Sequence, residues 1–485
     1  MKKHHLILAL ILLLTFFLRL PSLFEPFWYG DEGIFGAVAR NLNLGGVLYQ
    51  TAWDNKPPMI YLTYAAIFKF FGVSTFWLHL AAAVVVMATA AAIYEIAQAT
   101  IGTKRALFAS FIFGFLTSLR LIEGNLALTE IFMILPITLA MLIAVKRKFD
   151  YISLFVAGLL FAIASLYKQV GAFEAAALGI FVFLAEDNFL NFLKKGFVLS
   201  VGFVIPYAAT IGYFAQKHLV KDYIFAAYTY YRIYLGESPK YALLINISKI
   251  MPIVVAVLYG FWKKFKEKKV EISYLFILWA AFSFLGSYFS GRTYGHYLVQ
   301  SIPALSLLLA QISMIQISRQ RVVFALTFFL PLLFLTRLLF SQFLSGGPIN
   351  QVRYFKNFVD FAAHNKSTND YNDFFDRNVN TIDALADAIR AKNAVGESIY
   401  IWGDLPWLYA IVDAHNPSRY VTSFHVFGVP SGKEEVINDL NKNMPKYIIK
   451  PQSSIGYFDE LEKIIVSRYT HVAKIETADL YARKL

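Results

Sequence analysis

Residues 2–20 read KKHHLILALILLLTFFLRL, in which two lysines are followed by an apolar run from Leu6 to Leu20. A helix that spans a bilayer needs about 20 predominantly apolar residues, and Lys and Arg gather at its cytoplasmic end. A secretory signal peptide starts in a similar way, but residues 19–25 (RLPSLFE) lack the small-x-small pattern of a cleavage site. We therefore expect a retained first membrane helix with its basic end in the cytoplasm.

The composition of the whole chain is that of a membrane protein. Of its 485 residues, 58% are hydrophobic and 16% are charged, and the mean hydropathy is +0.53. Soluble domains are roughly half apolar and about a quarter charged, so lipid must cover the excess here. The net charge of +13 lies in short clusters between apolar runs, which indicates cytoplasmic loops and excludes nucleic acid as the main partner. The absence of cysteine excludes disulfides and thiolate metal sites.

The pattern of apolar runs predicts a polytopic α-helical membrane protein with about 11 transmembrane helices. If these segments cross in alternation, every basic cluster falls on the cytoplasmic side, as the positive-inside rule requires. The apolar segment 57–71 must then not cross. It begins with two prolines and carries Lys69, so we expect a helix on the outer face; the alternative is a true span paired with an unrecognised helix. The predicted spans are Leu6–Leu23, Phe76–Ala99, Arg105–Leu121, Leu126–Val145, Tyr151–Tyr167, Val170–Ala185, Gly196–Phe214, Ile245–Trp262, Ile272–Phe289, Tyr297–Ile315 and Val322–Phe343.

The character of the sequence changes near residue 346, where Asp, Asn, Lys and Glu become frequent. We expect a membrane module over residues 1–345, with a first outer loop over 24–75, and an extracytoplasmic α/β domain over 346–485. Alternating strands and helices favour a mainly parallel sheet in this domain. The predicted strands are Ser398–Gly403, Arg419–Ser423 and Lys446–Lys450, the helices are Pro406–Val412, Lys433–Asn441 and Asp459–Ser467, and His471–Ile475 and Leu480–Ala482 form a final hairpin.

The first outer loop holds the most informative polar residues. In WYGDEG (28–33), the carboxylates of Asp31 and Glu32 follow closely behind the first membrane helix. Ile34 to Leu42 reads as a short amphipathic helix that Asp31 would cap. Lys56 places a cation at the start of the surface helix. Taken alone, an acidic pair near a membrane is more typical of a solvated anchor than of catalysis.

Other polar residues fall in outer turns that the topology places on the same side. Lys168 lies in a short turn between two helices, and its alternative role is to snorkel to the headgroups. The stretch SGRTYGHY (290–297) brings together Arg292, His296 and Tyr297, which are good donors to a phosphate. The alternative for this stretch is an interfacial belt of aromatics with one arginine.

Glu123 and Glu130 lie near the outer ends of two helices, where an ionisable group is costly unless it is used or paired. Glu130 could join Asp31 and Glu32 in binding a divalent cation, for which carboxylate oxygens are suitable ligands. An ion pair with Lys56 or Lys168 is the alternative. The tyrosine-rich segment 226–234 either folds over a lipid donor or forms part of an aromatic belt.

In their order along the chain, these stretches resemble the GT-C class of membrane glycosyltransferases. The closest likeness is to the dolichyl-phosphate-mannose–protein mannosyltransferase superfamily, which includes bacterial aminoarabinose transferases of lipid A. The C-terminal domain does not resemble the β-trefoil insert of the eukaryotic protein mannosyltransferases, which argues against assuming a protein acceptor. The matching motifs are Asp31-Glu32, Ala37 to Leu42, Lys56-Pro57-Pro58, Glu130, Lys168, and His296-Tyr297 followed by Pro303.

The resemblance implies a hexosyl- or pentosyltransferase of the cell envelope that uses a polyprenyl-phosphate sugar donor and inverts the sugar's configuration. The acceptor would be a hydroxyl of a lipid, glycan or protein on the outer face of the cell membrane. Asp31 would be the catalytic base, supported by Glu32. Glu130 would orient the acceptor or hold a metal, and no cofactor beyond such a divalent cation is implied. The residues implied to bind the donor phosphate are Lys56, Lys168, Arg292, His296 and Tyr297.

Two other function classes compete with this interpretation. A transporter or lipid flippase would place charges or helix breaks near the membrane midplane, whereas the predicted helix interiors here are nearly free of charge. Glu95 and Arg337 lie towards span ends, and Pro136 and Pro206 are isolated. A scaffold that binds a partner through its C-terminal domain gives no reason for acids and cations to cluster on the outer face. The sequence therefore favours the enzyme.

Overall fold

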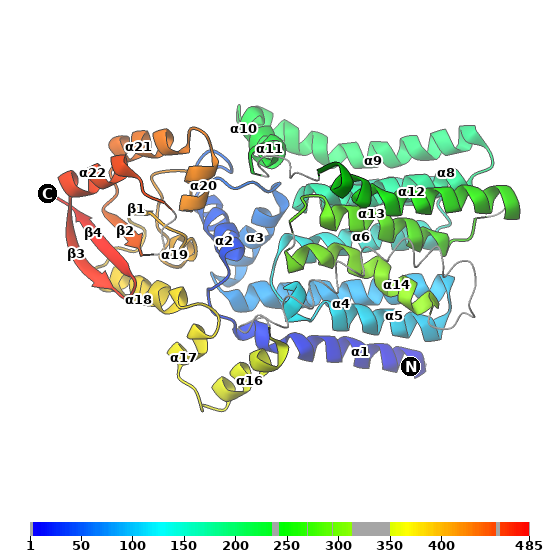
Figure 1. Ribbon diagram of the computed structural model, residues 1–485, viewed down its shortest axis with the longest axis horizontal. Coiled ribbons are helices and arrows are strands. Elements are labelled where there is room, and N and C mark those ends of the chain that lie inside the picture. Colours follow the sequence, from blue (N-terminus) through cyan, green and yellow to red (C-terminus); the bar gives the residue numbers. More distant parts are fainter. Residues whose placement is uncertain are drawn as a thin grey trace. The chain divides into compact units, whose positions relative to one another are not determined.

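The computed structural model describes residues 3–234, 242–268, 270–292, 294–312, 350–452 and 456–484 (Figure 1). The chain divides into two compact units, each made of segments that lie far apart in the sequence. The helical unit comprises Met1–Ser22, His79–Tyr213 and Glu237–Gln351. The mixed unit comprises Leu23–Leu78, Phe214–Gly236 and Val352–Leu485.

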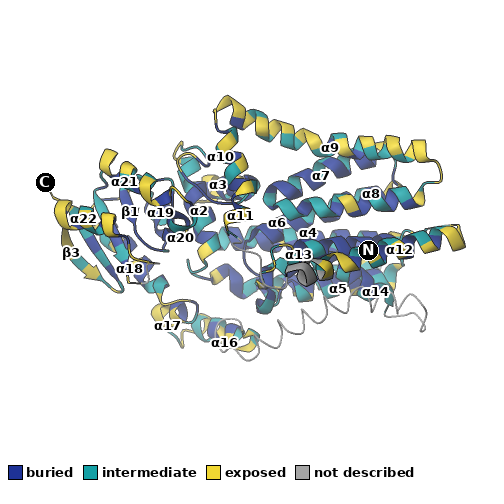
Figure 2. Cartoon of the chain, turned by 45° about the horizontal axis from the view of Figure 1, so that its top comes forward, coloured by how far each residue is buried: buried dark blue, intermediate teal, exposed yellow. Residues whose placement is uncertain are grey.

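The helical unit is a bundle of apolar helices that lie roughly parallel in both views (Figures 1 and 2). Within the described ranges, four helical stretches are long and apolar enough to cross a membrane: Lys3–Phe24, Thr75–Thr100, Thr129–Lys146 and Phe189–Gln216. The last of these exposes large apolar side chains such as Phe197 and Val204 along its length (Figure 2). A surface of this kind is stable only against lipid. The helices that lie wholly or largely in this unit are α1 (Lys3–Arg19), α4 (Thr75–Thr100), α5 (Thr103–Leu116), α6 (Thr129–Lys146), α7 (Tyr151–Tyr167), α8 (Phe173–Ala185), α9 (Phe189–Gln216), α12 (Ala242–Glu267), α13 (Tyr274–Tyr288) and α14 (Ile302–Ile312).

Each predicted span up to residue 315 overlaps one of these helices, while Val322–Phe343 lies outside the described residues. The number of eleven spans therefore stays a prediction. Several helices are shorter than predicted: α5 ends at Leu116, for example, and α14 begins only at Ile302. Short 3-10 segments take up the missing residues: η2 (Arg120–Ile122) follows α5, and η5 (Gly295–Ser301) precedes α14.

Arg19, the last residue of α1, fixes the segment between α5 and α6. Its guanidinium is 1% exposed, and Nη1 donates to the carbonyl of Thr117 at 2.9 Å and to that of Gly124 at 2.7 Å. A buried charge is tolerated only where such partners replace its water. The arginine thus holds in place the loop that leads to Glu123 and Glu130.

The mixed unit contains a four-stranded sheet in the order β1-β2-β4-β3. Its strands are β1 (Ile399–Ile401), β2 (Tyr447–Pro451), β3 (Tyr469–Ile475) and β4 (Ala478–Arg483). The final hairpin forms as predicted, but the prediction of a mainly parallel sheet is wrong. Only β1 and β2 pair in parallel, because the hairpin inserts β4 beside β2 in the antiparallel direction.

The predicted strand Arg419–Ser423 is also wrong. Tyr420 makes a single bridge with Trp53 of the first outer loop, and Thr422 caps the short helix α20 (Ser423–Gly428) by accepting from the amide of His425. The other predicted helices form as α19 (Trp407–Ile411), α21 (Gly432–Lys442) and α22 (Asp459–Arg468). The remaining helices of the mixed unit are α2 (Gly30–Asn43), α3 (Met59–Phe71), α10 (Val220–Ile224), η4 (Phe225–Thr229), α11 (Tyr231–Tyr234), α16 (Gln351–Ala362), α17 (Thr368–Asp373) and α18 (Asn378–Ala391).

The first outer loop packs against C-terminal residues within the mixed unit. A Cβ added at Gly33 would lie 2.9 Å from the indole of Trp407, and one added at Gly36 would lie 2.7 Å from it. These two glycines therefore let the indole of α19 lie directly on α2. The Trp407 Nε1 also donates to the carbonyl of Tyr29 at 3.2 Å. The two compact units therefore do not follow the predicted domain boundary at residue 346. The position of the C-terminal residues relative to the membrane stays a prediction.

Candidate functional site

The predicted site residues are distributed over both units. Glu130, Lys168, Arg292, His296 and Tyr297 belong to the helical unit, whereas Asp31, Glu32 and Lys56 belong to the mixed unit.

A buried ion pair lies at the centre of the first group. Lys168 is the C-cap residue of α7, and its Nζ donates to Oε1 of Glu130 in the first turn of α6. The two side chains are only 11% and 2% exposed, and Thr129 donates from Oγ1 to the other carboxylate oxygen at 2.7 Å. Of the interactions predicted for Glu130, the structure contains the ion pair with Lys168. Because both charges are desolvated, their positions are strongly coupled.

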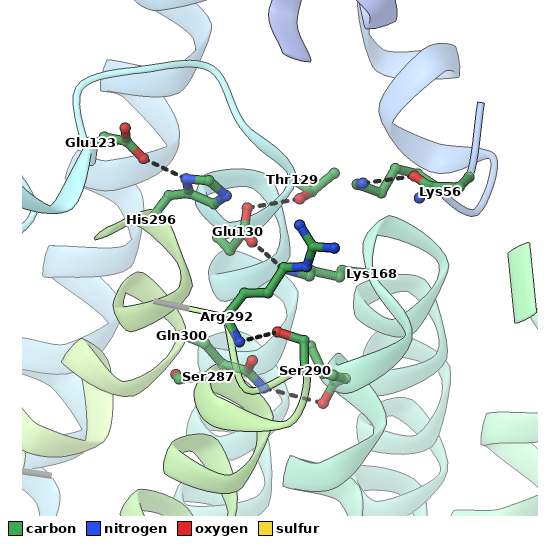
Figure 3. A network of polar contacts seen from close by, with 12 residues as sticks. Lys56, Glu123, Thr129, Glu130, Lys168, Ser287, Ser290, Arg292, His296 and Gln300 are labelled. Carbon is green, nitrogen blue, oxygen red and sulfur yellow. Dashed lines mark hydrogen bonds and ion pairs between the residues drawn. The ribbon is translucent and has the colours of Figure 1, made fainter. Parts of the chain in front are cut away.

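Two neighbours from η5 complete this group. The Nζ of Lys168 lies 3.6 Å from the centroid of the Tyr297 ring, a cation–π contact. The Nδ1 of His296 lies 2.5 Å from Oε2 of Glu123, and the histidine is only 8% exposed. Figure 3 shows the Lys168–Glu130 and His296–Glu123 pairs together with Arg292, whose amide donates to Oγ of Ser290 at 3.3 Å. The structure therefore brings the predicted Lys168, His296 and Tyr297 into one region around Glu130.

Three polar residues of this region had no assigned role in the sequence. Glu123 is the partner of His296 and adopts a left-handed backbone conformation with φ of 52°. Gln300 donates from Nε2 to Oε1 of Glu174 at 2.9 Å and to the carbonyl of Val170 at 3.1 Å. This contact fastens η5, which carries His296, to η3 (Gln169–Ala172) directly after Lys168. No local pattern signals these pairings, because their partners lie 126 to 173 residues apart.

The acidic pair of the second group lies inside the first turn of α2. The helix begins at Gly30, so Asp31 is not its cap, and the N-cap residue Tyr29 makes no side-chain capping bond. Carboxylates in a first turn are stabilised by the helix dipole. Burial, followed by the charges of Glu32 and Asp31, raises the pKa of Tyr64 well above its usual value. Glu32 is fully buried, whereas Asp31 is partly exposed.

The turn that carries Lys56 is held by tyrosine hydroxyls. The Lys56 amide donates to Oη of Tyr61 at 3.2 Å, and its carbonyl accepts from Oη of Tyr49 at 2.7 Å. Tyr61 also donates to Oδ2 of Asp54 at 2.7 Å. The Lys56 Nζ donates to the Asn55 side chain at 2.9 Å. The backbone of Lys56 is therefore fixed on both sides, which makes it a preorganised cation.

Within the ranges that the structure describes, no three His, Asp or Glu side chains are arranged to hold a metal ion. The divalent cation considered from the sequence thus stays a prediction.

Comparison with known proteins gives a consistent class. Residues 55–213 match the family model described as dolichyl-phosphate-mannose-protein mannosyltransferase, a segment that includes Lys56, Glu130 and Lys168. An uncharacterized protein of Aquifex aeolicus (strain VF5) is 25% identical over 325 residues, and the match spans 64% of each chain. The match thus covers less than two thirds of that relative.

The fold is shared with a solved structure over almost the whole chain. ArnT from Cupriavidus metallidurans bound to undecaprenyl phosphate superposes with a TM-score of 0.60 at 14% identity, covering 98% of this chain and 97% of that chain. The apo state of ArnT matches with the same TM-score at 16% identity. The resemblance to the GT-C membrane glycosyltransferases is thereby confirmed by the family match and by the fold.

Proposed function

We propose that this protein is an inverting glycosyltransferase that moves a sugar from a polyprenyl-phosphate donor to an acceptor hydroxyl on the outer face of the membrane. The observation that carries the proposal is the buried Lys168–Glu130 pair with Tyr297 beside it, in a chain whose residues 55–213 match a mannosyltransferase family. The solved ArnT with the same fold was bound to undecaprenyl phosphate, which supports a polyprenyl phosphate as the lipid part of the donor.

The cations would stabilise the negative charge of the departing phosphate. As the bond between the sugar carbon and the phosphate oxygen breaks, negative charge develops on the phosphate. Lys168 has three donor protons, of which the pair with Glu130 uses one, and Arg292 adds a planar pair of donors. Cations held in place before the reaction stabilise such charge without reorganisation. His296, in the same unit as Lys168 and Arg292, would add a donor to this phosphate, and the resemblance implies that Lys56 also binds the donor.

Asp31 would accept the proton of the acceptor hydroxyl. A carboxylate is too weak a base to remove that proton beforehand, so proton transfer must accompany the formation of the new bond. The acceptor oxygen attacks the sugar carbon, the phosphate departs from the opposite side, and the configuration inverts. Asp31 is better placed for this role than Glu32, because Asp31 is partly exposed and Glu32 is fully buried. The products are the glycosylated acceptor and the free polyprenyl phosphate.

The test is release of polyprenyl phosphate by the purified full-length chain, incubated with a panel of undecaprenyl-phosphate sugars and a membrane lipid extract as acceptor. Wild type should release the lipid phosphate, and Arg292→Ala should release it more slowly. Lys146→Ala is the matched control, since Lys146 pairs with Glu95 at the partly exposed ends of α6 and α4 and should keep full activity. A chain that moves these lipids between leaflets without cleaving them would be a flippase, and that result would reject the proposal.

A further inference from the structure

The turn that carries Lys56 is fastened from the C-terminal part of the mixed unit. The amide of Trp53 donates to the carbonyl of Arg419 at 2.8 Å, and the Trp53 side chain is fully buried. Its indole meets the ring of Tyr230 at 4.9 Å and that of His425 at 5.0 Å, both edge to face. Trp53 precedes Lys56 by three residues, so this packing limits how far the turn can move.

His425 of α20 supports the next residue of the turn. Its Nε2 lies 3.4 Å from Oδ1 of Asp54, and both side chains are nearly inaccessible, at 3% and 4% exposed. Burial lowers the pKa of His425 to about 4; the Asp54 charge raises it and the Lys56 charge lowers it further. The imidazole is therefore neutral at physiological pH. Within the described residues Nδ1 has no hydrogen-bond partner, so the ring proton belongs on Nε2, which faces Asp54.

Arg419 reaches the same turn by a second route. Its guanidinium is held by Glu435, at 2.9 Å from Nε and 3.1 Å from Nη2. Its Nη1 donates to the carbonyl of Tyr49 at 3.2 Å, and the Tyr49 hydroxyl in turn donates to the carbonyl of Lys56 at 2.7 Å. A chain of contacts thus runs from α21 through Arg419 and Tyr49 to the backbone of Lys56.

We propose that His425 and Arg419 are positioning residues for Lys56, so that the C-terminal part of the chain holds in place one of the cations proposed to bind the donor phosphate. The proposal rests on the proposed function in one respect, namely that Lys56 binds that phosphate. A displacement of about 1 Å at a reacting group can lower the rate as much as a hundredfold, so a loosened turn should be visible in kinetics. Without this positioning role, the C-terminal part of the chain would contribute only to recognition of an acceptor.

The kinetic test compares two substitutions of one residue. His425→Gln places an amide nitrogen near the position of Nε2 and keeps a donor to Asp54, whereas the shorter side chain in His425→Asn cannot reach. We expect kcat/KM for the donor to fall about tenfold in His425→Asn relative to His425→Gln, because the polar contact with Asp54 is lost. The KM for the acceptor should not change. His471→Asn is the control, because this exposed histidine of β3 contacts only the neighbouring strand in the described structure.

A second measurement does not depend on activity. Acetic anhydride labelling followed by mass spectrometry reports the accessibility of each lysine in the folded chain. His425→Asn should increase the labelling of Lys56 relative to His425→Gln, while the partly exposed Lys446 serves as the internal reference. If no donor supports transfer but Lys56 labelling still increases, the proposed function fails and the positioning role stands. Equal kinetics and equal labelling in the two variants would overturn the positioning role.

Arg419→Lys provides the same comparison if His425→Asn does not fold. A lysine keeps the charge beside Glu435 but cannot donate to Glu435 and the Tyr49 carbonyl in the same geometry. Lower donor kcat/KM and faster labelling of Lys56 would support the proposal, and unchanged values would reject it for Arg419. Arg468→Lys is the matched control, since the Arg468 guanidinium contacts Asn441 and Met444 at the surface.

Discussion

Replacing Lys168 with methionine should destabilise the protein far more than replacing Lys168 and Glu130 together. In the native chain the two side chains are 11% and 2% exposed, and each charge compensates the other. Removing one partner leaves a buried, uncompensated charge, which costs about 3–5 kcal/mol. In the double variant Lys168→Met/Glu130→Gln neither charge remains, and the glutamine can still accept the hydrogen bond from Thr129. We therefore expect about 3 kcal/mol of coupling between the two positions.

The assay is a double-mutant cycle of unfolding free energies, measured by circular dichroism in detergent for wild type, both single variants and the double variant. The control cycle uses Lys146 and Glu95, whose side chains are 47% and 36% exposed. That pair should couple by less than about 1 kcal/mol, because water screens exposed charges. Additive effects at Lys168 and Glu130 would refute the reasoning that burial makes this pair interdependent.

The same double variant separates stability from catalysis. It should fold nearly as well as wild type, yet it lacks the cation assigned to the leaving phosphate. We expect transfer from a polyprenyl-phosphate sugar to fall by 100-fold or more, on the order of the loss of one transition-state donor. A double variant with the wild-type rate would remove Lys168 from the phosphate site.

Four further outcomes can be measured. Asp31→Asn should abolish transfer while the unfolding midpoint stays near that of wild type; full activity would reject Asp31 as the base. Gly36→Ala should lower the unfolding free energy by about 1–3 kcal/mol, because its Cβ would meet an indole at 2.7 Å, whereas Gly30→Ala, with open space, should not. Burial lowers the pKa of His425 from 6.5 to about 4, so between these pH values the unfolded chain binds more protons than the folded chain. As the pH falls from 6.5 to 4, the unfolding free energy of wild type should therefore decrease by about 3 kcal/mol more than that of His425→Gln. A reporter placed after Lys484 should be accessible only from outside the cell, and a cytoplasmic signal would invert the predicted topology.

The helices of the bundle could be predicted because their signal is local. A run of about 20 apolar residues indicates a membrane helix whatever it packs against. The ends of α5 and α14 could not be predicted in this way, since hydropathy continues through the 3-10 segments η2 and η5. The direction of strand pairing was missed for a related reason. Whether β2 pairs with a parallel or an antiparallel neighbour depends on where the hairpin inserts, which the strand sequence alone does not encode.

The candidate site was predictable as a set of residue types but not as a set of contacts. Polar residues are costly near membrane helices, and for this reason the sequence identified Lys168, His296 and Tyr297 as candidates. Their partners could not be predicted, because Glu123 lies 173 residues from His296 and the turn around Glu123 has no distinguishing motif. The grouping of the first outer loop with C-terminal residues was missed as well. Trp407 and Arg419 look like ordinary core and surface residues until the loop packs against them.

The packing of the first outer loop on C-terminal residues has a consequence for the order of events during synthesis. Arg40 and its ion-pair partner Asp413 are 373 residues apart, and Trp407 and Tyr29 are 378 apart. At about 5–20 residues per second, the loop waits roughly 20 to 75 seconds before its partners are synthesised. During that time Trp407 does not yet cover the glycine-lined face of α2. A segment that is made early is therefore among the last to fold, and a chain shortened at its C-terminus would leave that segment without its packing partners.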